Sequence, residues 1–195
     1  MLIGKILFVL AGVIMSIIRR PHEKRNKSNE ITHNQQDTQE KVLLALVGIG
    51  MWLLPLIYIV SPLLAFADYT LPLWALGIGV IVMAVGLWLF WRSHADLGKN
   101  WSVSLEIRDE HTLITNGVYQ HVRHPMYSAI WLIALAQPLL LHNWLAGFGS
   151  IVGFGLMYLL RVPKEEEMMM AQFGEQYKTY MANTLNIPGR ILDKI

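Results

Sequence analysis

The sequence predicts an all-α integral membrane protein that forms one domain and has five transmembrane helices. Hydrophobic residues make up 54% of the 195 positions and charged residues only 15%, whereas about 25% of residues are charged in soluble globular domains. Long uncharged runs alternate with short polar segments, and nearly all Lys and Arg residues lie in three of those segments. The chain contains no cysteine, which excludes disulfides, thiolate catalysis and cysteine-ligated metals.

The first three predicted spans occupy residues 1–91. Residues 1–18 are apolar apart from Lys5, which lies close enough to the helix end to reach the membrane surface. We expect Pro21 to end this helix and the polar loop 19–41 to follow it. No pattern in this loop is typical of a catalytic site.

The second and third predicted spans are uncharged throughout. Residues 42–67 are more numerous than the roughly 20 that a helix needs to cross a bilayer. Pro55 is expected to kink this helix and Pro62 to end it. After a short turn, residues 71–91 form a third uncharged run of spanning length.

The last two predicted spans share one uncharged run, residues 126–160. This run is too long for one helix, so we divide it at a tight turn at residues 142–143. Each half is slightly short for a full span, which helix tilt or local bilayer thinning accommodates. With the polar segments 92–123 and 161–195, these two spans form the expected catalytic part, residues 92–195.

The distribution of positive charge predicts the topology. Of the sixteen Lys and Arg residues, all except Lys5 lie in residues 19–41, 92–123 and 161–195. Five spans place these three segments on the same side of the membrane. Because positive charge favours the cytoplasmic side, we expect the C-terminus inside and the N-terminus outside.

Two polar clusters flank the last two spans. The first, residues 117–127, combines tyrosines, histidines and an arginine, and the second, residues 161–167, contains three consecutive glutamates. A tight turn between the spans would bring Tyr127 close to Arg161. Arg161 and Glu165 are four residues apart and share one face of a helix. We therefore expect the two clusters to form one active site on the cytoplasmic face.

Each of these residues also has a purely structural interpretation. Arg161 could be an ordinary positive anchor, Tyr127 an interfacial aromatic residue, and residues 165–167 a solvated helix start. His124-Pro125 favours a site, because a residue before proline is held extended, which fixes the place of His124. The joint occurrence of these features indicates a site more strongly than any one of them does.

The motifs in these clusters resemble those of the isoprenylcysteine carboxyl methyltransferase family. The similarity covers about residues 97–190, and Pro163-Lys164 departs from the more acidic residues typical of the family at that place. The matching motifs are Thr112-Leu-Ile-Thr-Asn-Gly117-Val-Tyr119, Arg123-His124-Pro125-Met126-Tyr127, Arg161-Val-x-x-Glu165-Glu166 and Phe173-Gly174-Glu175-x-Tyr177-x-x-Tyr180.

The resemblance implies S-adenosylmethionine as methyl donor, bound on the cytosolic side without a Rossmann domain. In agreement, no G-x-G-x-x-G motif follows a predicted strand. It also implies that Glu165 holds the amino-acid or ribose end of the donor and that Arg161 faces the substrate carboxylate, with His124 and Tyr127 completing the catalytic set. By position, the implied cofactor-binding residues are Ser104, His111, Thr112, Leu113, Ile114, Tyr119, His124, Pro125, Met126, Tyr127, Glu165 and Glu166.

The preferred interpretation is methyl transfer to the carboxylate of a lipid-tailed, isoprenylcysteine-like small molecule or prenylated peptide. A carboxylate is already ionised at neutral pH, so the reaction needs alignment more than a base. The alternative is a phospholipid N-methyltransferase, whose amine acceptor must lose a proton to Glu165 or His124. A third possibility is a non-enzymatic membrane scaffold. We expect no nucleic-acid partner and no metal site, because the sequence shows neither a basic stripe nor histidine ligand spacing.

Overall fold

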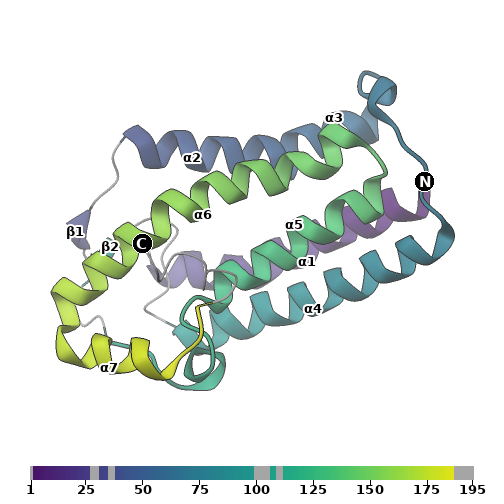
Figure 1. Cartoon of the computed structure of the whole chain (residues 1–195). Helices are drawn as coiled ribbons and strands as arrows, with labels where there is room; N and C mark the ends of the chain where they lie inside the picture. The colour runs from purple at the N-terminus through teal and green to yellow at the C-terminus, as the bar shows by residue number, and fades with distance from the viewer. Residues whose placement is uncertain (1, 27–30, 35–37, 99–105, 109–111, 187–195) are drawn as a thin grey trace.

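The computed structural model describes residues 2–26, 31–34, 38–98, 106–108 and 112–186. They form a bundle whose long helices run side by side along one axis (Figure 1). A two-stranded antiparallel ribbon lies at one end. The elements are α1 (Leu2–Asn26), β1 (Ile31–Asn34), α2 (Thr38–Gly48), a π-helical turn (Ile49–Leu53), α3 (Leu54–Val60), a 3-10 turn (Ala65–Ala67), α4 (Leu73–Leu97), β2 (Glu106–Arg108), a second 3-10 turn (Gly117–Gln120), α5 (Pro125–Leu141), α6 (Trp144–Phe173) and α7 (Glu175–Asn183).

Four helical segments in the described part of the chain are long and apolar enough to cross a membrane. They are Leu2–Glu23, Thr38–Val60, Leu73–Leu97 and Trp144–Phe173. The helix α5 is apolar but has only 17 residues. The all-α membrane class is therefore confirmed, whereas the fifth span stays a prediction.

The helix boundary expected at Pro21 is wrong, and two helices continue through a proline. The helix α1 continues through Pro21 to Asn26, and α6 continues through Pro163 to Phe173. A proline inside a helix removes one backbone hydrogen bond. In α6 the side chains on either side of Pro163 compensate, because Arg161, Val162 and Met168 are buried. The expected end of the second span is close to the observed one, since Ser61 is extended directly after α3.

The tight turn predicted at residues 142–143 is confirmed. His142 adopts a left-handed conformation (φ 52°), and the Asn143 side chain caps α6 by accepting hydrogen bonds from two backbone N–H groups at 3.1 and 2.9 Å. The Asn143 amide also donates to the Leu64 carbonyl at 2.7 Å and to Asp68 at 2.8 Å. This residue therefore joins the α5–α6 turn to the α3–α4 connection.

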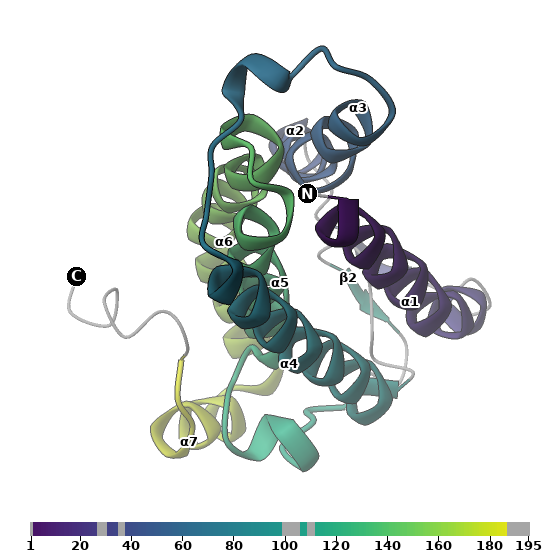
Figure 2. The same cartoon turned by 90° about the vertical axis from the view of Figure 1, so that its right-hand side faces the viewer.

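The helix α5 packs against α1, α4 and α6 and lies among them in the end-on view (Figure 2). Small side chains such as Ala129 and Ala136 allow this close packing, and both are fully buried. The buried Gln137 amide donates to the Gly50 and Ala146 carbonyls at 3.0 and 2.7 Å. These contacts fix α5, and its first turn is consequently held at the end of the bundle where α7 lies, which we call the site end (Figure 1).

Candidate active site

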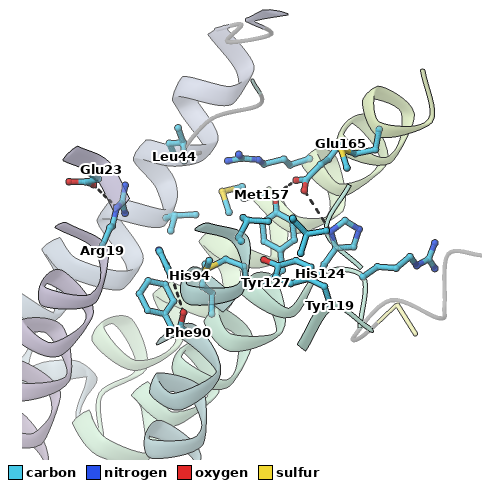
Figure 3. Close-up of a pocket in the computed structure, with 18 of the residues that line it drawn as sticks. Arg19, Glu23, Leu44, Phe90, His94, Tyr119, His124, Tyr127, Met157 and Glu165 are labelled. Carbon is cyan, nitrogen blue, oxygen red and sulfur yellow. Dashed lines mark hydrogen bonds and ion pairs between the residues drawn. The ribbon is translucent and has the colours of Figure 1, made fainter. Parts of the chain in front are cut away.

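A cavity of about 540 Å³ opens at the site end, within the range of roughly 300–1,000 Å³ usual for ligand pockets. Its lining residues come from α1, α2, the π-helical turn after α2, α4, α5, α6, α7 and the segment before α5. Glu165, His124 and Tyr127 lie on one side, and Arg19 and Glu23 of α1 lie across from them (Figure 3). The cavity therefore connects the two predicted polar clusters with the N-terminal helices.

The turn before α5 is fixed by Gly117 and Asp96. Gly117 has a φ of 61°, and a Cβ atom at this position would lie 2.1 Å from Asp96 Oδ2, so only glycine fits. The backbone N–H of Val118 donates to the same oxygen at 2.9 Å, and Arg92 pairs with the other Asp96 oxygen at 3.0 Å. This arrangement ties the turn to the end of α4 and holds Tyr119 at the cavity.

Glu165 forms the polar centre of the cavity wall. The Tyr127 hydroxyl donates a hydrogen bond to Glu165 Oε2 at 2.5 Å, and His124 Nδ1 lies 3.7 Å from Glu165 Oε1. His124 is non-helical (φ −124°, ψ 60°) directly before Pro125, the first residue of α5. His124 thus lies at the helix start outside the helical conformation, although its ψ differs from that of the extended conformation expected before proline.

Glu166 lies on the other side of His124. Its Oε1 atom is 3.0 Å from His124 Nε2 and 3.2 Å from Arg123 Nη1. Glu166 is not among the described residues that line the cavity, whereas His124 and Arg123 are. This geometry makes Glu166 a support for these two cavity residues.

Arg161 lines the cavity and forms a buried ion pair with a residue of α2. Its Nη1 atom lies 3.5 Å from Glu40 Oε1, and the two side chains are only 8% and 5% exposed. Glu40 stands in the first turn of α2. It was not singled out in the sequence, because one acidic residue at the edge of a polar loop carries no spacing signal.

The helix α7 contributes Tyr177 and Tyr180 to the cavity. The Tyr180 hydroxyl donates to the Tyr119 carbonyl at 2.7 Å. Burial raises the pKa of Tyr180 to about 12. Burial and the nearby Glu165 carboxylate raise the pKa of Tyr119 well above its usual value. Both hydroxyls therefore stay protonated at neutral pH.

The structure gathers most of the predicted site residues. Pro125 is buried at the start of α5, Glu166 lies behind His124, and Ser104 and His111 lie outside the described residues. No group of three or more acidic or histidine side chains in the described part of the chain is arranged to hold a metal ion. The predicted residues that line the cavity are Thr112, Leu113, Ile114, Tyr119, His124, Met126, Tyr127, Arg161 and Glu165.

One wall of the cavity was not anticipated from the sequence. It comes from α1, α2, the π-helical turn after α2 and α4. The residues of this wall follow no motif, so the sequence indicates only membrane spans and the ends of spans. His94 of this wall is buried, and its Nδ1 atom forms a hydrogen bond of 2.8 Å with the Phe90 carbonyl. The lining residues of this wall are Met15, Ser16, Arg19, Arg20, Glu23, Leu44, Val47, Met51, Trp52, Phe90, His94 and Leu97.

Comparisons with known proteins agree with these motifs. The model of the isoprenylcysteine carboxyl methyltransferase family matches residues 75–171. A protein-S-isoprenylcysteine O-methyltransferase of Dictyostelium discoideum is 33% identical over 127 residues, which are 62% of this chain and 51% of that protein. Protein-S-isoprenylcysteine O-methyltransferase B of Arabidopsis thaliana is 29% identical over 109 residues, 55% of each chain. The chain thus spans about half the length of these relatives.

The fold agrees as well. The solved structure of the eukaryotic intramembrane Ras methyltransferase ICMT matches with a TM-score of 0.53 and 25% identity. The match covers 82% of this chain and 54% of that one. Residues 75–171, which carry the first polar cluster, α5 and most of α6, are therefore similar to the isoprenylcysteine carboxyl methyltransferase family, and the fold of the chain is similar to that of the solved structure.

Proposed function

We propose that the protein transfers a methyl group from S-adenosylmethionine to the carboxylate of a lipid-tailed, isoprenylcysteine-like acceptor at the cytoplasmic membrane face. One observation carries this proposal. A single cavity joins a polar end, with Glu165 and Arg161, to apolar walls formed by membrane helices. Such a cavity suits a reaction between a charged donor and an acceptor with a long apolar tail. The similarity of residues 75–171 to the isoprenylcysteine carboxyl methyltransferase family supports the same chemistry.

The residues around Glu165 fit S-adenosylmethionine. Glu165 would hold the amino-acid or ribose end of the donor, and the carboxylate of Glu165 favours a cationic ligand. Tyr119 and Tyr177 both line the cavity, and aromatic faces attract cations. When bound, the cofactor supplies an electrophilic methyl group.

The acceptor carboxylate would lie against Arg161. An arginine can hold a carboxylate through two parallel hydrogen bonds, which fixes its direction as well as its distance. Because the carboxylate is ionised at neutral pH, alignment is the main contribution of the protein. The helices that surround the cavity also keep water from the nucleophile.

The acceptor's tail would occupy the apolar part of the cavity between α1 and α2. Away from the site end, the Phe8 ring of α1 lies 6.1 Å from the Trp52 ring of the π-helical turn that follows α2. Closer to the site end, Met15 and Val47 face the cavity from opposite helices. A tail could therefore enter sideways from the bilayer, which fits a lipid-tailed substrate.

We also propose the topology that the distribution of positive charge predicts. Arg92, Arg123 and Arg161 gather at the site end, which the positive-inside tendency assigns to the cytoplasm. The 17-residue helix α5 would serve as the fifth span beside its longer neighbours.

Purified protein in lipid nanodiscs tests the proposal in two steps. Calorimetry should detect S-adenosylmethionine binding, and labelled methyl transfer should occur to a farnesylated cysteine analogue and not to phosphatidylethanolamine. Transfer to the phospholipid alone would support the N-methyltransferase alternative, and no donor binding would support a scaffold. Glu167→Gln is a matched control for Glu165→Gln, since Glu167 is exposed on the same helix.

A further inference from the structure

We propose that Glu40 is a positioning residue that holds the Arg161 guanidinium and competes with the acceptor carboxylate for it. This inference rests on the proposed function, because it takes Arg161 as the group that binds the acceptor. Glu40 lies outside residues 75–171, which the family model matches. The N-terminal part of the chain therefore has a role in acceptor selection under this proposal.

The geometry places Glu40 behind Arg161 as seen from the cavity. Arg161 is among the described residues that line the cavity, and Glu40 is not. The two groups are 3.5 Å apart, with almost no exposure of either side chain. A guanidinium carries five N–H donors in a planar fork, so one edge can meet Glu40 while another meets a ligand.

Two physical effects follow from this pair, and they act in opposite directions. Glu40 fixes the direction of the guanidinium, which favours alignment of the bound acceptor. Its negative charge also repels an acceptor carboxylate at the same guanidinium, which weakens acceptor binding. Glu40 should therefore raise kcat and raise KM for a carboxylate acceptor.

A second contact also joins α2 to α6, so the two helices stay in contact when the charge of Glu40 is removed. Lys164 Nζ donates to Gln39 Oε1 at 2.9 Å, next to the Glu40–Arg161 pair. Glu40 also lies in the first turn of α2, where a neutral glutamine is still a good helix residue. Gln39→Ala is consequently a matched control, because it disturbs the same α2–α6 contact and keeps the Glu40 charge.

The test compares wild type with Glu40→Gln, Glu40→Ala and Gln39→Ala in nanodiscs. Glu40→Gln keeps a hydrogen-bond acceptor for Arg161 and loses the competing charge. Removing the negative charge of Glu40, which repels the acceptor carboxylate at Arg161, should lower KM for a farnesylated cysteine carboxylate roughly three- to tenfold. Its kcat should stay within about twofold of wild type. Glu40→Ala loses the orientation as well, and its kcat should fall by about tenfold or more.

Equilibrium binding of the farnesylated cysteine carboxylate and of its neutral carboxamide separates charge from packing. Glu40→Gln should tighten carboxylate binding and leave carboxamide binding unchanged, and Gln39→Ala should change neither. Equal changes for both ligands, or weaker carboxylate binding in Glu40→Gln, would overturn the role of Glu40. If wild type binds both ligands but transfers no methyl group, the proposed function fails while the charge effect of Glu40 is still measured by binding. A wild-type protein that binds neither ligand overturns both.

Discussion

At the scale of single residues, the contact between Tyr127 and Glu165 offers the most direct test of the cofactor site. The hydroxyl donates to the carboxylate at 2.5 Å, and hydrogen bonds to charged groups contribute about twice as much as neutral ones. Tyr127→Phe should therefore raise the Kd for S-adenosylmethionine by about tenfold, as the Glu165 carboxylate loses its fixed orientation. Calorimetry measures this change.

Tyr69→Phe is the control for this prediction. The Tyr69 hydroxyl donates to the Pro138 carbonyl at 2.6 Å, far from the site end, and its loss should lower thermal stability without changing the Kd. An unchanged Kd in Tyr127→Phe would show that the Tyr127–Glu165 pair does not belong to the donor site.

Arg161→Ala should mainly impair use of the acceptor. The guanidinium is expected to hold the acceptor carboxylate, so its removal should raise KM for the farnesylated cysteine analogue by about tenfold or more. The Kd for S-adenosylmethionine should stay within about twofold. Loss of donor binding with intact acceptor affinity would reverse the roles assigned to Arg161 and Glu165.

Most of the predicted site residues were accessible from the sequence because they occur in short motifs. His124 before Pro125 and Arg161 four residues before Glu165 both carry local signals, and the structure brings them to one cavity. Glu40 could not be found in this way. Its partner is 121 positions away along the chain, and only the packing of α2 on α6 brings the two together.

At the scale of elements, α7 provides a pH-dependent contact with the site. Tyr180 donates to the Tyr119 carbonyl, and burial raises the pKa of Tyr180 from 10.0 to about 12. A raised folded-state pKa means that the unfolded state loses its proton first as pH rises. The stability that Tyr180 contributes is therefore complete below pH 10 and is lost progressively between about pH 10 and 12.

Thermal unfolding of wild type and Tyr180→Phe between pH 8 and 11 measures this contribution. Tyr180→Phe should be the less stable protein at pH 8 by about 1 kcal/mol, the usual contribution of one hydrogen bond. The difference should narrow above pH 10. A difference that is constant across this range would contradict the assigned role of the hydroxyl.

Trp52 limits the apolar part of the cavity. It lines the cavity, while Gly12 of α1 packs so closely on its ring that a Cβ at position 12 would lie 2.8 Å from it. Trp52 lies twelve residues after Glu40, which corresponds to about 18 Å along a helix. Trp52→Ala should therefore lengthen the cavity and improve kcat/KM for a geranylgeranylated over a farnesylated acceptor by about threefold or more.

Trp88→Ala is the matched control, since Trp88 is 56% exposed and is not among the described lining residues. It should leave the preference between the two acceptors unchanged. A Trp52→Ala protein with the wild-type preference would show that the tail does not reach this ring.

The elements themselves could be predicted where hydrophobic runs and caps coincide. The turn at residues 142–143 is one example, because Asn143 both interrupts the apolar run and caps α6. Pro21 was a poorer guide, because the helix that it was expected to end continues through it. Pro21 and Pro163 lie inside helices, since buried contacts on both sides of Pro163 outweigh the lost hydrogen bond.

At the scale of the whole molecule, composition was enough to predict a helical membrane protein, and the structure agrees. Composition could not predict that α1 and α2 meet near Trp52 and leave a cavity nearer the site end. Both helices have apolar side chains on all faces, which is typical of membrane spans. Periodicity therefore does not indicate which face meets the bilayer and which meets the cavity.

The topology gives the last prediction, and the absence of cysteine from the chain makes it simple to test with single introduced thiols. Thr70 and Thr179 are both exposed and lie on opposite sides of α4, α5 and α6 in the chain. If all three helices cross the membrane, Thr70→Cys should react with an impermeant maleimide added outside intact cells. Thr179→Cys should react only after permeabilisation, because the proposed topology places α7 and the site end in the cytoplasm. Leu2→Cys should behave like Thr70→Cys, since two spans separate these positions.

Labelling of Thr70→Cys and Thr179→Cys from the same side would show that α5 does not span the bilayer. Exchanged labelling sides would place the cavity outside the cell.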